Sequence, residues 1–346
     1  MANEPRPTRE SGIALPAASR DDTRVRPAAR AAVAIAAVGI ASAAYQRAAD
    51  ASDQRRFPPP GQLADIGGRR IHLLTQGSGA PVVVIVPALG ANVLEWVRVQ
   101  REAAADTTVV VADRAGFGWS DPAPLGTMTF DAMAEDLRAA LRAADIEPPY
   151  VIAGHSLGGI IARRFQARYP EDVSGMLLVD SSHEDQVRRL GDGPWYGFSR
   201  AASRQLRVLG LRRIAAHMGM VGGLSAESLA WETVPERVAA AKAISLSTKQ
   251  RRTVVREMLL LARTHGQPQN LGALPLTVLS AGSGKRQKWP EWEPWCELQD
   301  DLAATSPASA YMYAVNADHN VHLDDPGVVV QTIRDLVERC RWRPGP

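Results

Sequence analysis

Residues 150–159 have the sequence YVIAGHSLGG, a short apolar run followed by a glycine-rich turn. The apolar run predicts a buried strand, and the segment after the turn, as far as Pro170, has the composition of a helix. Residues 154–158 also fit the pattern G-x-S-x-G, which requires a strand that turns sharply into a helix. Glycine on both sides of Ser156 leaves room for a strained backbone at the serine. We therefore expect the Ser156 hydroxyl to project from a strand end, beside the first turn of a helix, as a nucleophile.

Strands and helices alternate on both sides of this turn. Continuous β-branched or apolar runs are typical of strands that are buried on both faces, and they occur at residues 81–86, 107–112 and 173–179. Further strands are expected at 276–279 and 311–315, a hairpin at 63–74 around Gly67-Gly68, and helices at 92–104, 130–144, 160–169 and 328–340. This alternation predicts an α/β fold with a mostly parallel central sheet and helices on both faces.

Residues 183–271 interrupt the alternation. They are rich in Arg, Leu and Ala, have helical character, and form a segment too long for a connection within a compact domain. We expect a helical cap, inserted over the carboxyl edge of the sheet. The α/β core would then consist of residues 62–182 and 272–341.

The amino terminus differs from the rest of the chain. Residues 1–30 are rich in Pro, Arg and acidic residues without apolar periodicity, which predicts a disordered tail. Residues 31–46 carry no charge and follow several arginines, which predicts an apolar helix. This helix is interpreted as a membrane anchor or an export signal, with an alanine-rich soluble helix of a cytoplasmic protein as the alternative. Arginines on its amino-terminal side favour a location of the remaining chain outside the cytoplasm.

The overall composition excludes several classes of function. Hydrophobic residues make up 45% and charged residues 22% of the 346 residues, and the net charge is +3. The basic residues are dispersed, so nucleic-acid binding is not expected. Cys296 and Cys340 have no Cys or His at metal-ligand spacing, so no metal site is expected. We favour two free thiols, and a disulfide between them is the alternative.

Three segments together resemble the α/β-hydrolase fold superfamily. They are DRAGFGWSD at 113–121, GHSLGG at 154–159 and Ala317-Asp318-His319. The resemblance extends over roughly residues 62–341. It implies a triad of serine, acid and histidine in that order, an oxyanion hole, a small-molecule substrate and no cofactor. Some similar proteins also carry an amino-terminal membrane anchor.

The histidine of such a triad should follow the last strand, because a loop there can hold an imidazole over the serine. His319 is at that place, and we favour it as the base. His322 is the other candidate; if it is not the base, it is expected either to support the site or to lie at the surface. The usual place for the acid, after the strand at 276–279, has no carboxylate before Glu291. We therefore favour Asp180, at the end of the strand at 173–179, and keep Glu291 and Glu184 as alternatives.

The oxyanion hole should combine the N–H after the nucleophile with one from the loop that follows the first buried strand. That loop is Pro87-Ala88-Leu89-Gly90, where the superfamily usually has His-Gly in place of Pro87-Ala88. Because proline has no N–H, we expect the two donors to be the backbone N–H groups of Leu89 and Leu157.

The predicted function is hydrolysis of a carboxylic ester or related acyl compound through an acyl-enzyme on Ser156. The alternatives are the same triad acting on an amide, a lactone or a carbon–carbon bond, and a binding protein that has lost turnover. A serine at position 156 argues against epoxide hydrolases and haloalkane dehalogenases, whose nucleophile is aspartate. Tryptophans are expected either to line a pocket for an apolar acyl or alcohol group or to pack the cap on the sheet. They are Trp195 and Trp231 in the cap, and Trp289, Trp292 and Trp295, spaced three apart, in the loop after the strand at 276–279.

Overall fold

The computed structural model describes residues 22–191, 213 and 234–341. These residues form one eight-stranded sheet with the order β1-β2-β4-β3-β5-β6-β7-β8. The hairpin β1–β2 is antiparallel and joins the sheet through an antiparallel pair with β4, whereas β4, β3, β5, β6, β7 and β8 run parallel. The predicted α/β fold with a mostly parallel sheet is confirmed.

All eight strands that the sequence predicts are present. Every residue of β3, β4, β5 and β7 is buried, because these strands lie inside the sheet and are covered on both faces. The strands are β1 (Gln62–Asp65), β2 (Arg70–Gln76), β3 (Val82–Val86), β4 (Val109–Ala112), β5 (Tyr150–His155), β6 (Val173–Val179), β7 (Leu276–Ala281) and β8 (Ser309–Ala314).

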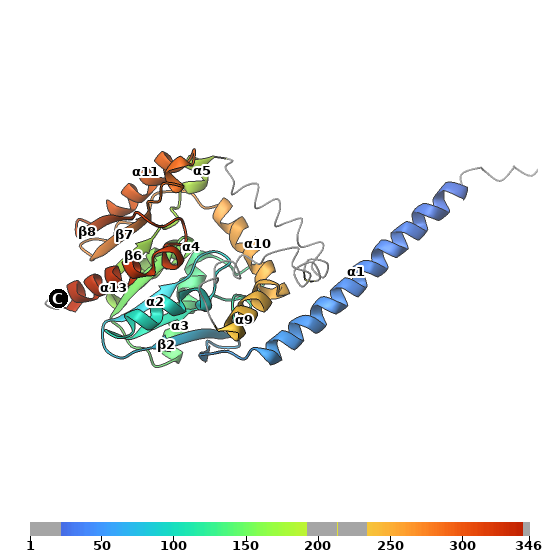
Figure 1. The fold of residues 1–346 in the computed structure, drawn as a ribbon, viewed down its shortest axis with the longest axis horizontal. Helices are drawn as coiled ribbons and strands as arrows, with labels where there is room; N and C mark the ends of the chain where they lie inside the picture. Colours follow the sequence, from blue (N-terminus) through green and yellow to red (C-terminus); the bar gives the residue numbers. More distant parts are fainter. Residues whose placement is uncertain (1–21, 192–212, 214–233, 342–346) are drawn as a thin grey trace, which may run out of the picture.

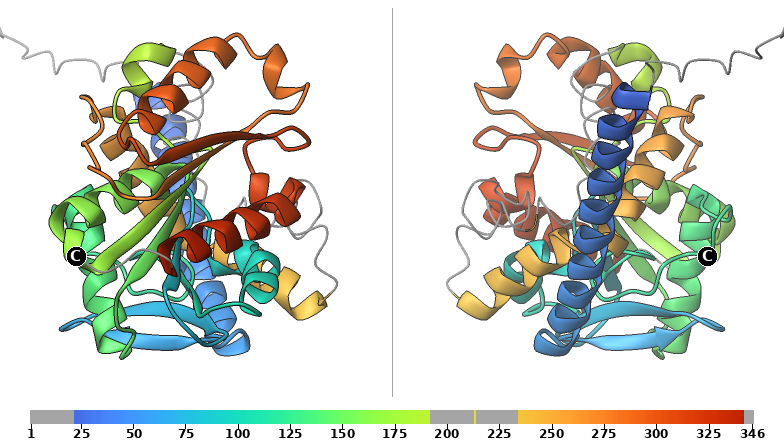
Figure 2. Two further views of the ribbon diagram at one scale, coloured as in Figure 1. Left: turned by 90° about the vertical axis from the view of Figure 1, so that its left-hand side faces the viewer. Right: turned by 90° about the vertical axis from the view of Figure 1, so that its right-hand side faces the viewer.

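Helices cover the two faces of the sheet (Figure 2). One apolar cluster contains α3 (Phe130–Ala143) and α4 (Leu157–Arg168), and the other contains α2 (Val97–Ala103) and α13 (Pro326–Arg341). The Thr129 hydroxyl accepts a bond from the N–H of Ala132 and so caps α3. The helix expected at 92–104 begins as a 3-10 turn, η1 (Val93–Trp96), and continues as α2. The helix expected at 328–340 is α13.

The described part of the long segment between β6 and β7, which we call the insertion, is helical. It contains α5 (Gln186–Leu190), α9 (Pro235–Ser245) and α10 (Thr248–Ala262), of which α10 packs on loops of the core (Figure 1). Trp195 and Trp231, expected in the cap, lie outside the described residues.

The amino-terminal helix is longer than the sequence indicated. Helix α1 (Asp22–Arg56) includes residues 22–30, which we expected in the disordered tail, and extends ten residues beyond the expected end at residue 46. The predicted bounds followed the apolar stretch. Residues with high helix propensity, such as Ala, Arg and Gln, extend beyond that stretch on both sides, so the helix is longer. The amino-terminal part of α1 projects from the rest of the molecule, and its carboxyl-terminal end lies beside the insertion (Figure 1). Gln46 donates there to the carbonyl of Leu246.

The prediction for the segment after β7 was also wrong. It was expected to be a loop, but it contains η4 (Arg286–Lys288) and the twelve-residue helix α11 (Trp292–Ala303). Pro294 obscured this helix in the sequence, yet it lies in the first turn, where proline costs no intrahelical hydrogen bond. Cys296 on α11 and Cys340 on α13 are free thiols in the structure.

Candidate active site

Ser156 lies between β5 and α4 in a strained backbone conformation. Its φ is 51° and its ψ is −123°, a region that residues with a side chain rarely adopt. A Cβ on Gly154 would lie 2.6 Å from the carbonyl oxygen of Gly158, and a Cβ on Gly158 would lie 2.1 Å from that of Val86. Glycine is therefore required on both sides of Ser156, for close packing of strand on helix and of helix on β3.

His319 contacts both Ser156 and Asp180. Its Nε2 lies 3.1 Å from the Oγ of Ser156, and its Nδ1 lies 2.6 Å from Oδ2 of Asp180. Asp180 directly follows β6, has a φ of 36° and is fully buried. The structure thus brings together the three residues that the sequence selected for a triad.

The alternative acids have other surroundings. Glu184 forms a bidentate, buried ion pair with Arg163 of α4, at 2.9 and 3.2 Å. Glu291 directly precedes α11 and is half-buried. Asp180, in contrast, is hydrogen-bonded to His319.

Asp180 is held by donors on several sides. The indole N–H of Trp295 donates to Oδ1 at 2.9 Å, the N–H of Ala281 donates to the same oxygen at 3.1 Å, and Arg286 lies 3.4 Å from Oδ2. Burial alone would raise the pKa of this carboxyl, but the hydrogen bond from His319, the charge of Arg286 and the hydrogen bond from Trp295 act against it and contribute to a pKa below the usual value. Asp180 is therefore ionised at neutral pH.

An ionised carboxylate fixes the tautomer of His319. Because a carboxylate only accepts hydrogen bonds, the proton of the imidazole must be on Nδ1, facing Asp180. The lone pair of Nε2 then faces the Ser156 hydroxyl, which is the arrangement that a general base needs.

The sequence does not identify Arg286 as a site residue, and it points to Trp295 only for the substrate pocket or for packing. Trp295 was visible only as one of three tryptophans spaced three apart, and nothing in that spacing indicated an indole N–H directed at a carboxylate. Of its neighbours, Trp289 is about half exposed, with the guanidinium of Arg286 over its ring, and Trp292 lies against Tyr313 of β8.

Two further histidines surround His319. His155 donates from Nε2 to the carbonyl of His319 at 2.8 Å, and so helps to orient the backbone of the loop. His322 is 1% exposed, which excludes the surface role considered for it, and it stacks on Trp96 with ring centroids 4.1 Å apart. Among the described residues, neither ring nitrogen of His322 has a hydrogen-bond partner.

Both of these histidines are neutral in the folded protein. Burial lowers the pKa of His155 to about 3, with a smaller contribution from His319, and burial also lowers the pKa of His322 well below 6.5. In the unfolded chain both groups bind a proton below about pH 6.5. The stability that they contribute is therefore complete above pH 6.5 and is lost as the pH falls from 6.5 towards 3.

The His322→Phe variant is expected to resist acid better than the wild type. Phenylalanine keeps the ring stack on Trp96 but removes one group that takes up a proton on unfolding. The free energy of unfolding, measured by urea denaturation between pH 7 and 4, should fall less steeply, by up to about 1.4 kcal/mol per pH unit. Parallel pH profiles for the two proteins would contradict the assignment of His322 as a buried neutral group.

The two expected oxyanion donors lie on backbone segments that touch. Leu157 is the first residue of α4, and Leu89 belongs to residues 87–90, which we call the oxyanion loop. The close approach of Gly158 to the carbonyls of Val86 and Pro87 brings the start of α4 against this loop. In the part of the chain that the structure describes, the N–H groups of Leu89 and Leu157 donate no hydrogen bond to another protein group.

The chain belongs to the alpha/beta hydrolase fold family, whose model matches residues 81–326. It is 25% identical over 261 residues to the uncharacterized protein YqjL of Bacillus subtilis, covering 75% of this chain and 85% of that protein. Among solved structures it resembles a thermophilic esterase from Thermogutta terrifontis, with a TM-score of 0.59, 24% identity, and coverage of 80% of this chain and 97% of the esterase. The enol-lactonase from Burkholderia xenovorans LB400 has the same TM-score at 16% identity, with 80% and 100% covered. At these identities the two structures show a shared fold.

Proposed function

We propose that this protein is a serine hydrolase that cleaves carboxylic esters or related acyl compounds through an acyl-enzyme on Ser156. The observation that carries the proposal is the position of the His319 ring, bonded through Nδ1 to the ionised Asp180 and through Nε2 to the Ser156 hydroxyl. A serine hydroxyl becomes nucleophilic when a neighbouring imidazole takes its proton, and a carboxylate behind the imidazole stabilises the resulting cation.

In the first half of the reaction, Ser156 Oγ bonds to the carbonyl carbon of the ester while Nε2 of His319 takes the hydroxyl proton. The carbonyl oxygen becomes an oxyanion, to which Leu89 and Leu157 donate from their N–H groups, and the amino terminus of α4 adds a favourable dipole. The bond to the alcohol then breaks, and Nε2 gives its proton to the departing oxygen. The acyl group remains on Ser156.

In the second half, a water oxygen attacks the acyl carbon while Nε2 of His319 takes one of its protons. The bond to Ser156 Oγ breaks, the serine regains a proton from Nε2, and a carboxylic acid leaves. The same atoms serve a lactone, which is a cyclic ester, and an amide needs a stronger proton donation to its leaving nitrogen. Esters are therefore the substrates that this site should cleave fastest.

A substrate panel tests the bond type. We expect the full-length protein to hydrolyse p-nitrophenyl esters of short and medium acyl chains, to hydrolyse lactones more slowly, and to leave p-nitroanilides nearly intact. A folded protein that turns over no acyl substrate would contradict the proposal and favour a binding protein with a hydrolase fold.

We also propose that α1 anchors the protein in a membrane. By its length and composition, the stretch from Ala29 to Arg56 of this helix is long and apolar enough to cross a bilayer. Val33, Val38 and Ile40 are between 57% and 72% exposed, which is unfavourable for side chains of this size in water. Arg24, Arg26 and Arg30 precede the apolar part and favour a hydrolase domain outside the cytoplasm. An apolar substrate dissolved in the membrane would suit this location.

Cell fractionation tests the anchor. The full-length protein should sediment with membranes after alkaline carbonate extraction, and Val38→Lys should shift much of it to the supernatant, because a charge at the centre of a span costs about 3 kcal/mol. The control is Gln54→Lys, in the polar end of α1. A wild type that is entirely soluble would remove the anchor and leave the active site untouched.

A further inference from the structure

The carbonyl groups of the oxyanion loop are held by a buried arginine. Arg114 donates from Nη1 to the carbonyl of Pro87 at 2.5 Å and from Nη2 to the carbonyl of Ala88 at 2.9 Å. The carbonyl of Ala88 also accepts from the N–H of Ala91 at 3.1 Å. Its direction is therefore fixed from two sides.

The carbonyl of Ala88 and the N–H of Leu89 belong to the same peptide group. Because that group is planar and trans, its C=O and its N–H point in opposite directions. The bonds that fix the Ala88 oxygen therefore also fix where the Leu89 N–H points. A cationic donor on the oxygen polarises the peptide further and makes its N–H a better donor to an oxyanion.

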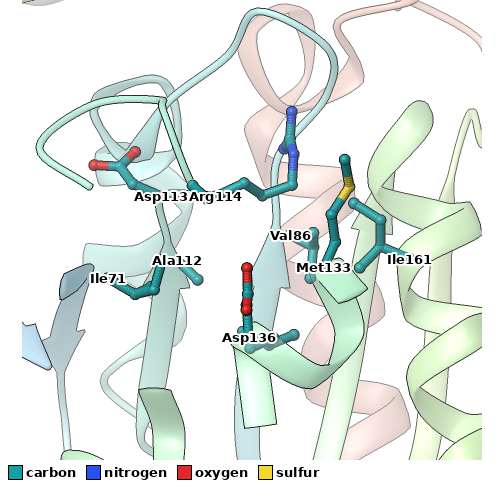
Figure 3. Close-up of a pocket in the computed structure, with 10 residues that line it drawn as sticks. Ile71, Val86, Ala112, Asp113, Arg114, Met133, Asp136 and Ile161 are labelled. Atoms are coloured by element: carbon teal, nitrogen blue, oxygen red, sulfur yellow. The ribbon is translucent and has the colours of Figure 1, made fainter. Parts of the chain in front are cut away.

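Arg114 is itself held by the insertion. Its Nε and Nη2 donate to the two carboxylate oxygens of Glu257 on α10, both at 2.9 Å, and the two side chains are 5% and 0% exposed. Arg114 leaves the loop after β4 in a different direction from its neighbour Asp113 (Figure 3). Asp113 accepts instead from the N–H groups of Val93 and Trp119.

The same face of α10 holds the oxyanion loop at a second point. Gln250, seven residues before Glu257, donates to the carbonyl of Gly90 at 2.9 Å. Val254 lies between them in the sequence, and its Cγ2 would be 3.8 Å from a Cβ at Gly90. One helix of the insertion is thus bonded to the last residue of the loop directly and to its first two residues through Arg114.

We propose that Arg114 and Glu257 are positioning residues, which set the direction of the Leu89 N–H and make the oxyanion hole dependent on the placement of α10. This inference rests on the proposed serine hydrolase function. A positioning role and a purely stabilising role predict different effects of breaking this ion pair. Loss of a purely stabilising pair lowers the free energy of unfolding and leaves kcat unchanged. Loss of a positioning pair misdirects the Leu89 N–H, which raises the energy of the transition state and leaves substrate binding nearly unchanged. We therefore expect kcat to fall.

The test uses full-length Glu257→Gln and Arg114→Lys. Glutamine keeps the shape but loses the charge, and lysine keeps the charge but has no planar fork to reach two carbonyls and a carboxylate. We expect kcat for a p-nitrophenyl ester and the rate of reaction with a fluorophosphonate both to fall about 10- to 100-fold, because losing an oxyanion donor outright costs about 10²–10³-fold. KM should stay within about twofold, since ground-state binding is little affected.

The matched control is Asp172→Asn, which breaks an ion pair with Arg138 at 2.7 Å between α3 and the turn before β6. It should lower the thermal midpoint as Glu257→Gln does, without lowering kcat. If folded Glu257→Gln retains wild-type kcat and fluorophosphonate reactivity, or if its loss is confined to KM, the positioning role is refuted while the serine hydrolase stands. A wild type inert to both reagents would instead remove the proposed function, and this inference with it.

Discussion

The Ser156→Ala variant is expected to lose ester hydrolysis by at least about 10⁴-fold in kcat, because it removes the hydroxyl that His319 contacts and that forms the proposed acyl-enzyme. KM should change little, since the hydroxyl contributes to the reaction far more than to binding of the substrate. Turnover of a p-nitrophenyl ester by purified full-length protein, followed by release of p-nitrophenol, measures both constants.

The control for this variant is Ser174→Ala. Ser174 lies near the start of β6, at the opposite end of the strand from Asp180, and its hydroxyl donates to the carbonyl of Tyr150. Removal of this hydroxyl should leave kcat within about twofold, because Ser174 lies away from the triad. Persistent turnover in Ser156→Ala, with normal turnover in the control, would place the nucleophile elsewhere.

The second large effect is expected from Asp180→Asn, which should lower kcat by about 10³–10⁴-fold at neutral pH. An asparagine can direct its NH₂ group at Nδ1 of His319 and so favour the tautomer with the proton on Nε2, where it can no longer accept the proton of Ser156. The fold should be kept, because asparagine still accepts from Trp295 and from the N–H of Ala281.

Glu291→Gln tests one of the two alternative acids, the other being Glu184, which is paired with Arg163. Glu291 is half-buried at the start of α11, so its neutral form should retain wild-type kcat. Loss of turnover in Glu291→Gln together with near-normal turnover in Asp180→Asn would exchange the roles of the two carboxylates.

The sheet could be predicted from the sequence because its signals are local. Buried parallel strands leave continuous apolar runs such as 82–86, and the turn at Ser156 needs glycines at fixed positions. The same locality selected the triad residues: Ser156 and Asp180 directly follow strands, and His319 lies in the loop after the last strand.

The elements that were misjudged depend on signals that compete or act over long range. Helix α11 contains a proline that is tolerated only because it falls in the first turn, and α1 continues past its apolar stretch on helix propensity alone. The donors around Asp180 are more than a hundred positions away from it in the sequence. Arg114 and Glu257 are also more than a hundred positions apart. Such pairings follow from the packing of the insertion and of α11 on the sheet, and no local pattern encodes them.

Reaction with a fluorophosphonate, followed by mass spectrometry of the intact protein and of its peptides, tests the central claim most directly. The account predicts a single adduct, on the peptide that contains Ser156, and none in Ser156→Ala. An adduct on another residue, or equal labelling of wild type and Ser156→Ala, would contradict it.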